Sequence, residues 1–259
     1  MVGLLYGAVV LMATFFGAFV GLGGGVIIKP VLDFFNMHPL AQITFFSSCG
    51  VFAMSVTATA RHLKNKTPID QKVVLLVALG SSLGGYLGNA LFRTALLHAN
   101  KPELVKIIQS FCLALLLIFV IISVNCHLKT FHLKNPFATI LIGLLLGFFA
   151  AFLGVGGGPI NVAAMTLFFS FTMKDAAVYS VAVIFFSQLT NLVTTFCTAP
   201  IKEYDLKMLI FVIPCAIFGG LFGAKFNRKC CEKTIQTVFT IVVSLIVLLN
   251  IYNAVSSLL

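Results

Sequence analysis

Two short glycine runs are the residues of this chain most able to build a binding site. Gly21-Leu-Gly-Gly-Gly25 and Gly154-Val-Gly-Gly-Gly158 each lie inside a long apolar stretch. Glycine is about 1 kcal/mol less favourable than alanine in a helix interior, so each run is expected to break its helix. Backbone N–H groups and the positive end of a helix dipole at such a break suit an anion. The candidate substrate-binding glycines are Gly23, Gly24, Gly25, Gly156, Gly157 and Gly158.

The alternative is that these glycines only let neighbouring helices approach closely. Other glycines follow the GxxxG spacing of helix interfaces, and we assign them to that role: Gly80, Gly84, Gly88, Gly143 and Gly147. A GxGGG run that occurs twice at matching places is more specific than GxxxG. Neither run is followed by a lysine in Walker spacing, which argues against a nucleotide loop. The two runs are therefore predicted to form part of a site.

Hydroxyl and amide side chains follow each glycine run on otherwise apolar stretches, and they need partners at membrane depth. Residues three or four apart share a helix face, so both stretches can present a polar stripe. The alternative function for any one of them is a hydrogen bond between helices. The candidate substrate-binding residues of this kind are Ser47, Ser48, Thr57, Asn161, Ser180, Gln188, Thr190 and Asn191.

The residue types missing from these stretches narrow the substrate class. No His/Cys cluster has the spacing of a metal site, so the sequence predicts neither a metal nor another cofactor. Of the seven acidic residues, only Asp33 is expected to reach membrane depth, whereas a cation or proton site usually needs buried carboxylates. An anionic or neutral substrate is favoured. Lys29 lies four residues after the first run, where it could bind an anion or extend to the membrane interface.

The elements that position these residues must be membrane helices. The chain has 259 residues, of which 60% are hydrophobic and 9% charged, far from the balance of a soluble domain. Its length allows several helices of about 20 residues. We predict an all-α polytopic membrane protein with eight apolar segments, near residues 3–28, 40–60, 73–97, 104–125, 137–158, 176–198, 207–224 and 234–252.

An internal repeat organises these segments. Phe16-Gly-Ala-Phe-Val-Gly-Leu-Gly-Gly-Gly25 recurs as Phe149-Ala-Ala-Phe-Leu-Gly-Val-Gly-Gly-Gly158, an offset of 133 residues. We therefore predict two homologous membrane repeats, 1–125 and 137–259, joined by a basic loop at 126–136. Duplicated halves with interrupted helices are typical of secondary transporters.

Basic residues bear on how the halves are oriented. If all eight segments cross the bilayer, Lys and Arg divide almost evenly between its two sides. If each glycine-broken segment enters and returns, the basic residues gather on one side, as the positive-inside rule requires. The second alternative gives each half three crossings and inverts the halves. It predicts that Lys66 and Lys229 are both cytoplasmic.

The two glycine signatures, each early in a half, resemble those of the sulfite exporter TauE/SafE family of bacterial membrane permeases. The similarity in layout covers nearly the whole chain, and the second half also has Pro159 after its glycines, where the first has Val26. The resemblance implies export of a small sulfur-containing or organic anion, such as sulfite, a sulfonate or sulfoacetate. It also implies a location in the inner (plasma) membrane.

We therefore expect a secondary transporter, not an enzyme, in which one half rocks against the other. Its partners would be the anion, the lipid bilayer and a possible coupling ion. Nucleic acid is not expected, because the basic residues lie in short loops between apolar segments. Two alternatives remain, namely an anion channel and a membrane redox or assembly factor that uses Cys230 and Cys231. The oligomeric state is not predicted.

Overall fold

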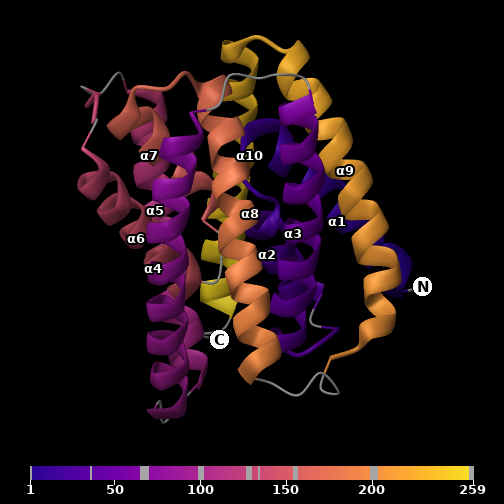
Figure 1. The fold of residues 1–259 in the computed structure, drawn as a ribbon. Coiled ribbons are helices and arrows are strands. Elements are labelled where there is room, and N and C mark those ends of the chain that lie inside the picture. Colours follow the sequence, from indigo (N-terminus) through magenta and orange to yellow (C-terminus); the bar gives the residue numbers. More distant parts are fainter. Residues whose placement is uncertain are drawn as a thin grey trace.

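The computed structural model is a bundle of α-helices (Figure 1). It describes residues 2–35, 37–64, 70–98, 102–126, 130–133, 135–153, 157–198 and 204–256. A short 3-10 helix, η2 (Leu206–Met208), precedes α9. The ten α-helices are α1 (Val2–Val20), α2 (Gly25–Phe35), α3 (Leu40–Lys64), α4 (Gln71–His98), α5 (Pro102–Asn125), α6 (Pro136–Phe152), α7 (Gly158–Phe169), α8 (Met173–Thr198), α9 (Leu209–Lys229) and α10 (Glu232–Ser256).

The helix count corrects the expectation of eight segments. Both glycine runs interrupt a helix, as predicted, but the chain after each run forms a helix of its own, α2 and α7. In the described part of the chain, seven helical segments are long and apolar enough to cross a membrane, and they lie in α1, α3, α4, α5, α8, α9 and α10. With 17 residues, α6 is shorter. The protein is therefore a multi-pass, all-helical membrane protein.

Each broken segment forms a helical hairpin whose two ends lie together. At the first hairpin, the Tyr6 hydroxyl of α1 lies 2.7 Å from Nδ1 of His38, which follows α2. At the second, the backbone N–H groups of Phe131 and Leu133, before α6, donate to the carbonyls of Leu167 and Phe168 in α7. Each hairpin therefore enters and leaves the bundle at one end.

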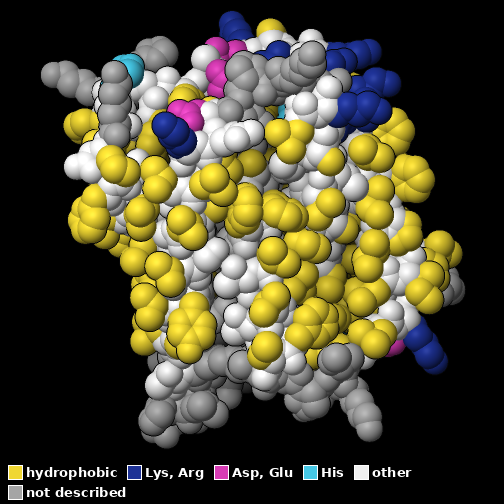
Figure 2. Space-filling view, in the orientation of Figure 1, with side chains coloured by type: hydrophobic (Ala, Val, Ile, Leu, Met, Phe, Trp, Pro, Cys, Tyr) yellow, Lys and Arg dark blue, Asp and Glu magenta, His cyan; other side chains and the backbone are white. Residues whose placement is uncertain are grey.

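Contacts between connections identify one end of the bundle, which we call the basic end. The backbone N–H of Asp70, before α4, donates to the Tyr179 hydroxyl near the start of α8. Nζ of Lys174 donates to the carbonyls of Arg228 and Cys230 at the end of α9. Lys and Arg side chains gather at this end, uppermost in Figure 2. The basic residues on the helix turns that meet here are Arg61, Lys64, Lys72, Lys174, Lys225, Arg228, Lys229 and Lys233.

Glycines join the hairpins to long helices of the other half. On α4, a Cβ atom at Gly88 would meet the carbonyl oxygen of Phe148, Cβ of Ala151 and the backbone nitrogen of Phe152 in α6. Gly80, Gly84, Gly143 and Gly147 make similar close contacts between α4 and α6. This confirms that they let helices approach closely. In lipid such close backbone contact is a main source of helix association.

The pair α1 and α9 is joined in the same way. A Cβ atom at Gly223 of α9 would meet the carbonyl oxygen of Phe15, Cβ of Ala18 and the backbone nitrogen of Phe19 in α1. Close pairs advance together along both chains, from Gly3 with Phe211 to Phe15 with Gly223, so the two helices run parallel.

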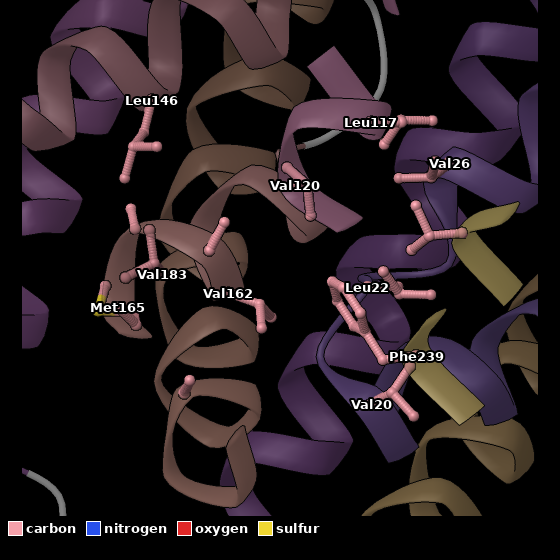
Figure 3. Packing of buried hydrophobic residues seen from close by; sticks show 14 of the residues in the cluster. Val20, Leu22, Val26, Leu117, Val120, Leu146, Val162, Met165, Val183 and Phe239 are labelled. Atoms are coloured by element: carbon pink, nitrogen blue, oxygen red, sulfur yellow. The ribbon is translucent and has the colours of Figure 1, made fainter. Parts of the chain in front are cut away.

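Helices α3 and α8 cross at the centre of the bundle. Phe45 contacts Phe196 and Phe52 stacks on Phe185 with ring centroids 5.6 Å apart, an antiparallel pairing that brings the two helix midpoints together. Beside this crossing, the larger hydrophobic cluster contains Val20, Leu22 and Val26 from the first hairpin together with Val162 and Met165 from the second (Figure 3). The hairpins are therefore packed into one core.

The close contact between α4 and α6 can be tested with two neighbouring glycines. We expect Gly84→Ala to lower the free energy of unfolding by about 1–3 kcal/mol, because the new methyl group overlaps the backbone of Leu144. Gly85→Ala is the matched control, since its nearest atom beyond its own helix is 4.0 Å away, and alanine favours a helix. Thermal unfolding in detergent compares the two. Equal stabilities would show that α4 and α6 do not pack as described.

Candidate functional site

The two glycine loops meet inside the bundle. Gly21, Gly23, Gly24 and Gly157 have positive φ angles of 82°, 76°, 71° and 79°, a region in which residues with a Cβ atom are strained. Where the loops touch, a Cβ atom at Gly158 would overlap the carbonyl group of Leu22. Glycine is thus required both by the backbone turn and by the close approach.

One hydroxyl group ties both loops to the central helix α8. Oγ of Ser180, which is fully buried, lies 2.7 Å from the carbonyl oxygen of Gly21 and 3.3 Å from that of Gly158. A Cβ atom at Gly21 would also lie 2.5 Å from Cα of Ala177, one turn earlier on α8. Ser180 therefore holds the two hairpins against the same turn of α8.

Two amide side chains satisfy carbonyl groups where the broken helices end. Nδ2 of Asn227, on α9, donates to the carbonyl oxygen of Phe19 at 2.8 Å. Nε2 of Gln109, on α5, donates to the carbonyl oxygen of Phe152. Phe19 and Phe152 are 133 residues apart, each near the end of the helix before a glycine run. Both amides are almost fully buried, so they supply hydrogen bonds that water cannot.

The N-terminal ends of two helices remain at this junction. Helix α2 begins at Gly25 and α7 at Gly158, and the two helices contact each other. Pro159 occupies the first turn of α7, as the sequence predicted. Because acceptors at the breaks are bonded to Ser180, Asn227 and Gln109, the local field is dominated by helix N-termini, which favour negative charge.

A second group of polar residues joins α3, α4 and α8. Nδ2 of Asn89 donates to Oδ1 of Asn191, whose Nδ2 donates to Oγ of Ser48, both at 3.0 Å. The hydroxyl of Thr190 donates to Oγ of Ser82 at 3.1 Å. These side chains lie beyond the α3–α8 crossing, on the side away from the basic end.

The predicted site residues therefore fall into separate places. Gly23, Gly24, Gly25, Gly157, Gly158 and Ser180 lie at the loop junction, and Asn161 is buried in the first turn of α7. Ser48, Thr190 and Asn191 belong to the polar group on α3, α4 and α8. Ser47 is buried on α3. Gly156 lies outside the described residues.

Two of the predicted residues behave differently from the rest. Gln188 is almost fully buried, and its Oε1 has no hydrogen-bond partner among the described residues. The hydroxyl of Thr57 donates to carbonyls of its own helix, and the side chain packs against Gly220 of α9. Thr57 is therefore part of a helix interface, away from the loop junction and the polar group.

Sequence reasoning missed four residues: Ser82, Asn89, Gln109 and Asn227. Each is a single polar side chain on a long helix that carries no glycine run. Its position in an apolar segment was the available signal, since such a side chain needs a partner in lipid. Which partner it has depends on how the helices pair.

The adjacent cysteines lie in the turn between α9 and α10. Cys230 is partly buried, Cys231 is exposed, and both are free thiols. A hydrogen bond with the Thr234 hydroxyl lowers the pKa of Cys231. Among the described residues, no group of His, Cys, Asp and Glu is placed to hold a metal ion.

Comparison with known proteins settles the family. The sequence profile described as sulfite exporter TauE/SafE matches residues 6–250. The chain belongs to the sulfite exporter TauE/SafE family. It is therefore a membrane transporter and not an enzyme, which removes the redox factor from the alternatives.

TauE/SafE relatives cover almost the whole chain. The probable membrane transporter protein YunE of Bacillus subtilis is 29% identical over 95% of this chain and 96% of its own length. A probable membrane transporter protein of Methanocaldococcus jannaschii is 25% identical over 86% of each chain. YjnA of Bacillus subtilis, a further probable membrane transporter protein, is 24% identical over 91% of this chain and 96% of its own. No solved structure matches.

The bridge made by Ser180 predicts a stability effect. We expect Ser180→Ala to lower the free energy of unfolding by about 1–3 kcal/mol, because it leaves buried carbonyl groups of both loops without this donor. Ser187→Ala is the control, since the Ser187 hydroxyl donates only to the Ile184 carbonyl of its own helix. Denaturant unfolding in detergent measures both. A loss in Ser187→Ala as large as in Ser180→Ala would contradict a bridging role.

Proposed function

We propose that this protein is a secondary transporter that exports a small sulfur-containing or organic anion, such as sulfite, a sulfonate or sulfoacetate. The observation that carries the proposal is the junction at which Gly158 meets Leu22 beside Ser180, with the N-termini of α2 and α7 in contact. Backbone N–H groups at these ends are suitable donors for an oxyanion. The polar group of Ser48, Asn89 and Asn191 would line the path beyond the junction.

The packing supports the proposed duplication with inversion. Gly88 and Gly223 meet the same three kinds of atoms on residues 133 apart, Phe148 and Phe15, Ala151 and Ala18, and Phe152 and Phe19. Phe52 and Phe185 are also 133 apart, and they stack on each other where α3 and α8 cross. A pair of equivalent residues in mutual contact lies on a two-fold axis. Because α3 and α8 are antiparallel, this axis would lie in the membrane plane. On this basis the repeats remain 1–125 and 137–259, with the connecting loop 126–136 between them.

The same packing changes the proposed motion. Helix α1 is joined to α9, and α6 to α4, by backbone contacts at glycines. Rocking one sequence half against the other would break both interfaces. We infer instead that α1 moves with α9 and α6 moves with α4, and that the change between outward and inward access occurs at the α3–α8 crossing and the loop junction.

Transport itself is tested by flux. Purified protein in proteoliposomes should move sulfite, sulfoacetate or thiosulfate down an imposed anion gradient. Saturation at high anion concentration would distinguish a transporter from the alternative, an anion channel. Folded protein that moves none of these anions would refute the proposal.

The glycine loops should be essential for this flux. We expect Gly24→Val and Gly157→Val each to abolish transport, because valine is strained at the positive φ of both positions and its Cβ would crowd Ala13 or Ala150. Membrane insertion should be unchanged, as judged by protein recovered from the membrane fraction. Gly85→Ala, which lies in open packing, should transport normally. Near-normal flux in both valine variants would leave the loops without a role in transport.

Sidedness follows from the charges at the basic end. The positive-inside rule places this end in the cytoplasm. Lys66 lies outside the described residues, but Lys64 and Asp70 on either side of it place the α3–α4 connection at the basic end, together with Lys229. In a cysteine-free background, Lys66→Cys and Lys229→Cys should react with an impermeant maleimide only from the cytoplasmic side. Lys207→Cys, before α9, should react from the other side. Labelling of the first two from opposite sides would contradict the inverted arrangement.

A further inference from the structure

The last turns of α3 contain two buried polar atoms that the proposed path does not use. Oγ1 of Thr59 and Nε2 of His62 are buried and have no hydrogen-bond partner among the described residues. The His62 residue is only 3% exposed. Positions three apart lie on the same face of a helix, so the two atoms are neighbours. Buried polar groups in native proteins nearly always have partners, and an exception calls for a bound ligand or a functional role.

The surroundings of this pair carry positive charge. Thr59 and His62 lie at the basic end, where α3 packs beside α9. Arg61 and Arg228 are close enough to His62 to act on it electrostatically. Arg228 is exposed at the last turn of α9, next to Asn227, which binds the end of α1. The pair therefore lies between the basic surface and the helix that leads to the first glycine loop.

The other end of the bundle has no equivalent pair. The offset of 133 residues places Leu192 and Thr195 of α8 opposite Thr59 and His62. The Thr195 hydroxyl donates to the carbonyl of Asn191, so it is satisfied within its own helix. A role in the fold shared by both halves would be expected at both ends. The pair instead distinguishes one end from the other.

We propose that Thr59 and His62 form a second oxyanion site, at which the substrate binds from the cytoplasm before it reaches the glycine loops. The Thr59 hydroxyl and the Nε2–H of a neutral imidazole each donate a hydrogen bond to an anion. Arg61 and Arg228 supply the favourable charge. The site rests on the proposed function, because it assumes that the transported species is a small anion. Its presence at one end gives the transporter a difference in apparent affinity between its two faces.

Binding can be observed directly at His62. Full-length protein with ¹⁵N-labelled histidine, in detergent, would be titrated with sulfate and followed by the imidazole nitrogen signals. His62→Gln assigns the His62 signal. We expect this signal to shift and saturate with sulfate, and the His132 signal in the loop before α6 to stay unchanged. A His62 signal unmoved by sulfate overturns the site.

Flux from each face gives the second measurement. Thr59→Val and His62→Gln should raise the half-saturating anion concentration about tenfold when the anion is supplied at the cytoplasmic face. Flux from the other face should keep its half-saturating concentration. Thr195→Val, at the opposite end, is the matched control and should change neither. An equal change from both faces overturns the proposal.

These results separate the second site from transport itself. Anion flux in the original protein without a sulfate shift at His62 overturns this site and leaves the proposed function standing. A saturable shift at His62 without flux of any anion supports the site and overturns the proposed function. If His62→Gln fails to fold, the Thr59→Val flux and the sulfate titration of the original protein still decide the question.

Discussion

The absence of water in the bilayer core is the constraint on which this structure depends. Breaking a helix there leaves backbone carbonyl and N–H groups that only protein or ligand can satisfy. At both breaks, side chains from distant parts of the sequence serve the carbonyls: Asn227 for Phe19, Gln109 for Phe152, and Ser180 for Gly21 and Gly158. The breaks are thus tolerated because α5, α8 and α9 surround them. What these contacts leave at the junction is the start of α2 and of α7, and so a bias toward negative charge.

Close backbone approach is the second requirement, and it explains where the remaining glycines lie. Lipid offers no hydrophobic force to hold one helix against another, so contact area and proximity must do so. Glycines on α4 and α6, and on α1 and α9, let backbones meet without side chains between them. The central helices α3 and α8 meet differently, through stacked phenylalanines and a few hydrogen bonds. A rigid contact at the periphery and a side-chain contact at the centre suit a protein whose centre must change shape.

Much of this could be predicted from the sequence, because the signals were local. Three glycines in a row break a helix wherever they lie, and Pro159 marks the helix that follows. Helices α2 and α7 were harder to predict. Lys29, Pro30 and Asp33 interrupt the apolar pattern of α2, yet the helix continues through all three. The segment expected at 137–158 ended where α7 begins, since nothing in the pattern indicated a second, short helix inside the bundle.

The partners of the polar residues depend on helix pairing, which local patterns do not encode. Thr57 and Thr190 are the same residue at equivalent places in the two halves, but Thr57 packs on Gly220 whereas Thr190 donates to Ser82. Asn89 was missed because it lies on a helix assigned to packing, directly after Gly88. The family resemblance was sound, since it rested on glycine signatures that the whole-chain comparison also supports.

The pairing of α1 with α9 also bears on how the protein is made. The hydrogen bond from Asn227 to Phe19 joins residues 208 positions apart, so the first helix to leave the ribosome must wait for almost the last one before its contacts are complete. During that interval the first hairpin carries a glycine loop whose Gly21 carbonyl has no Ser180 to bind, and it must be sheltered by the insertion machinery or by nearby helices already in the membrane. Insertion of the individual helices and assembly of the bundle are therefore separate events in time. The glycine loops can acquire their final shape only after synthesis has passed α9.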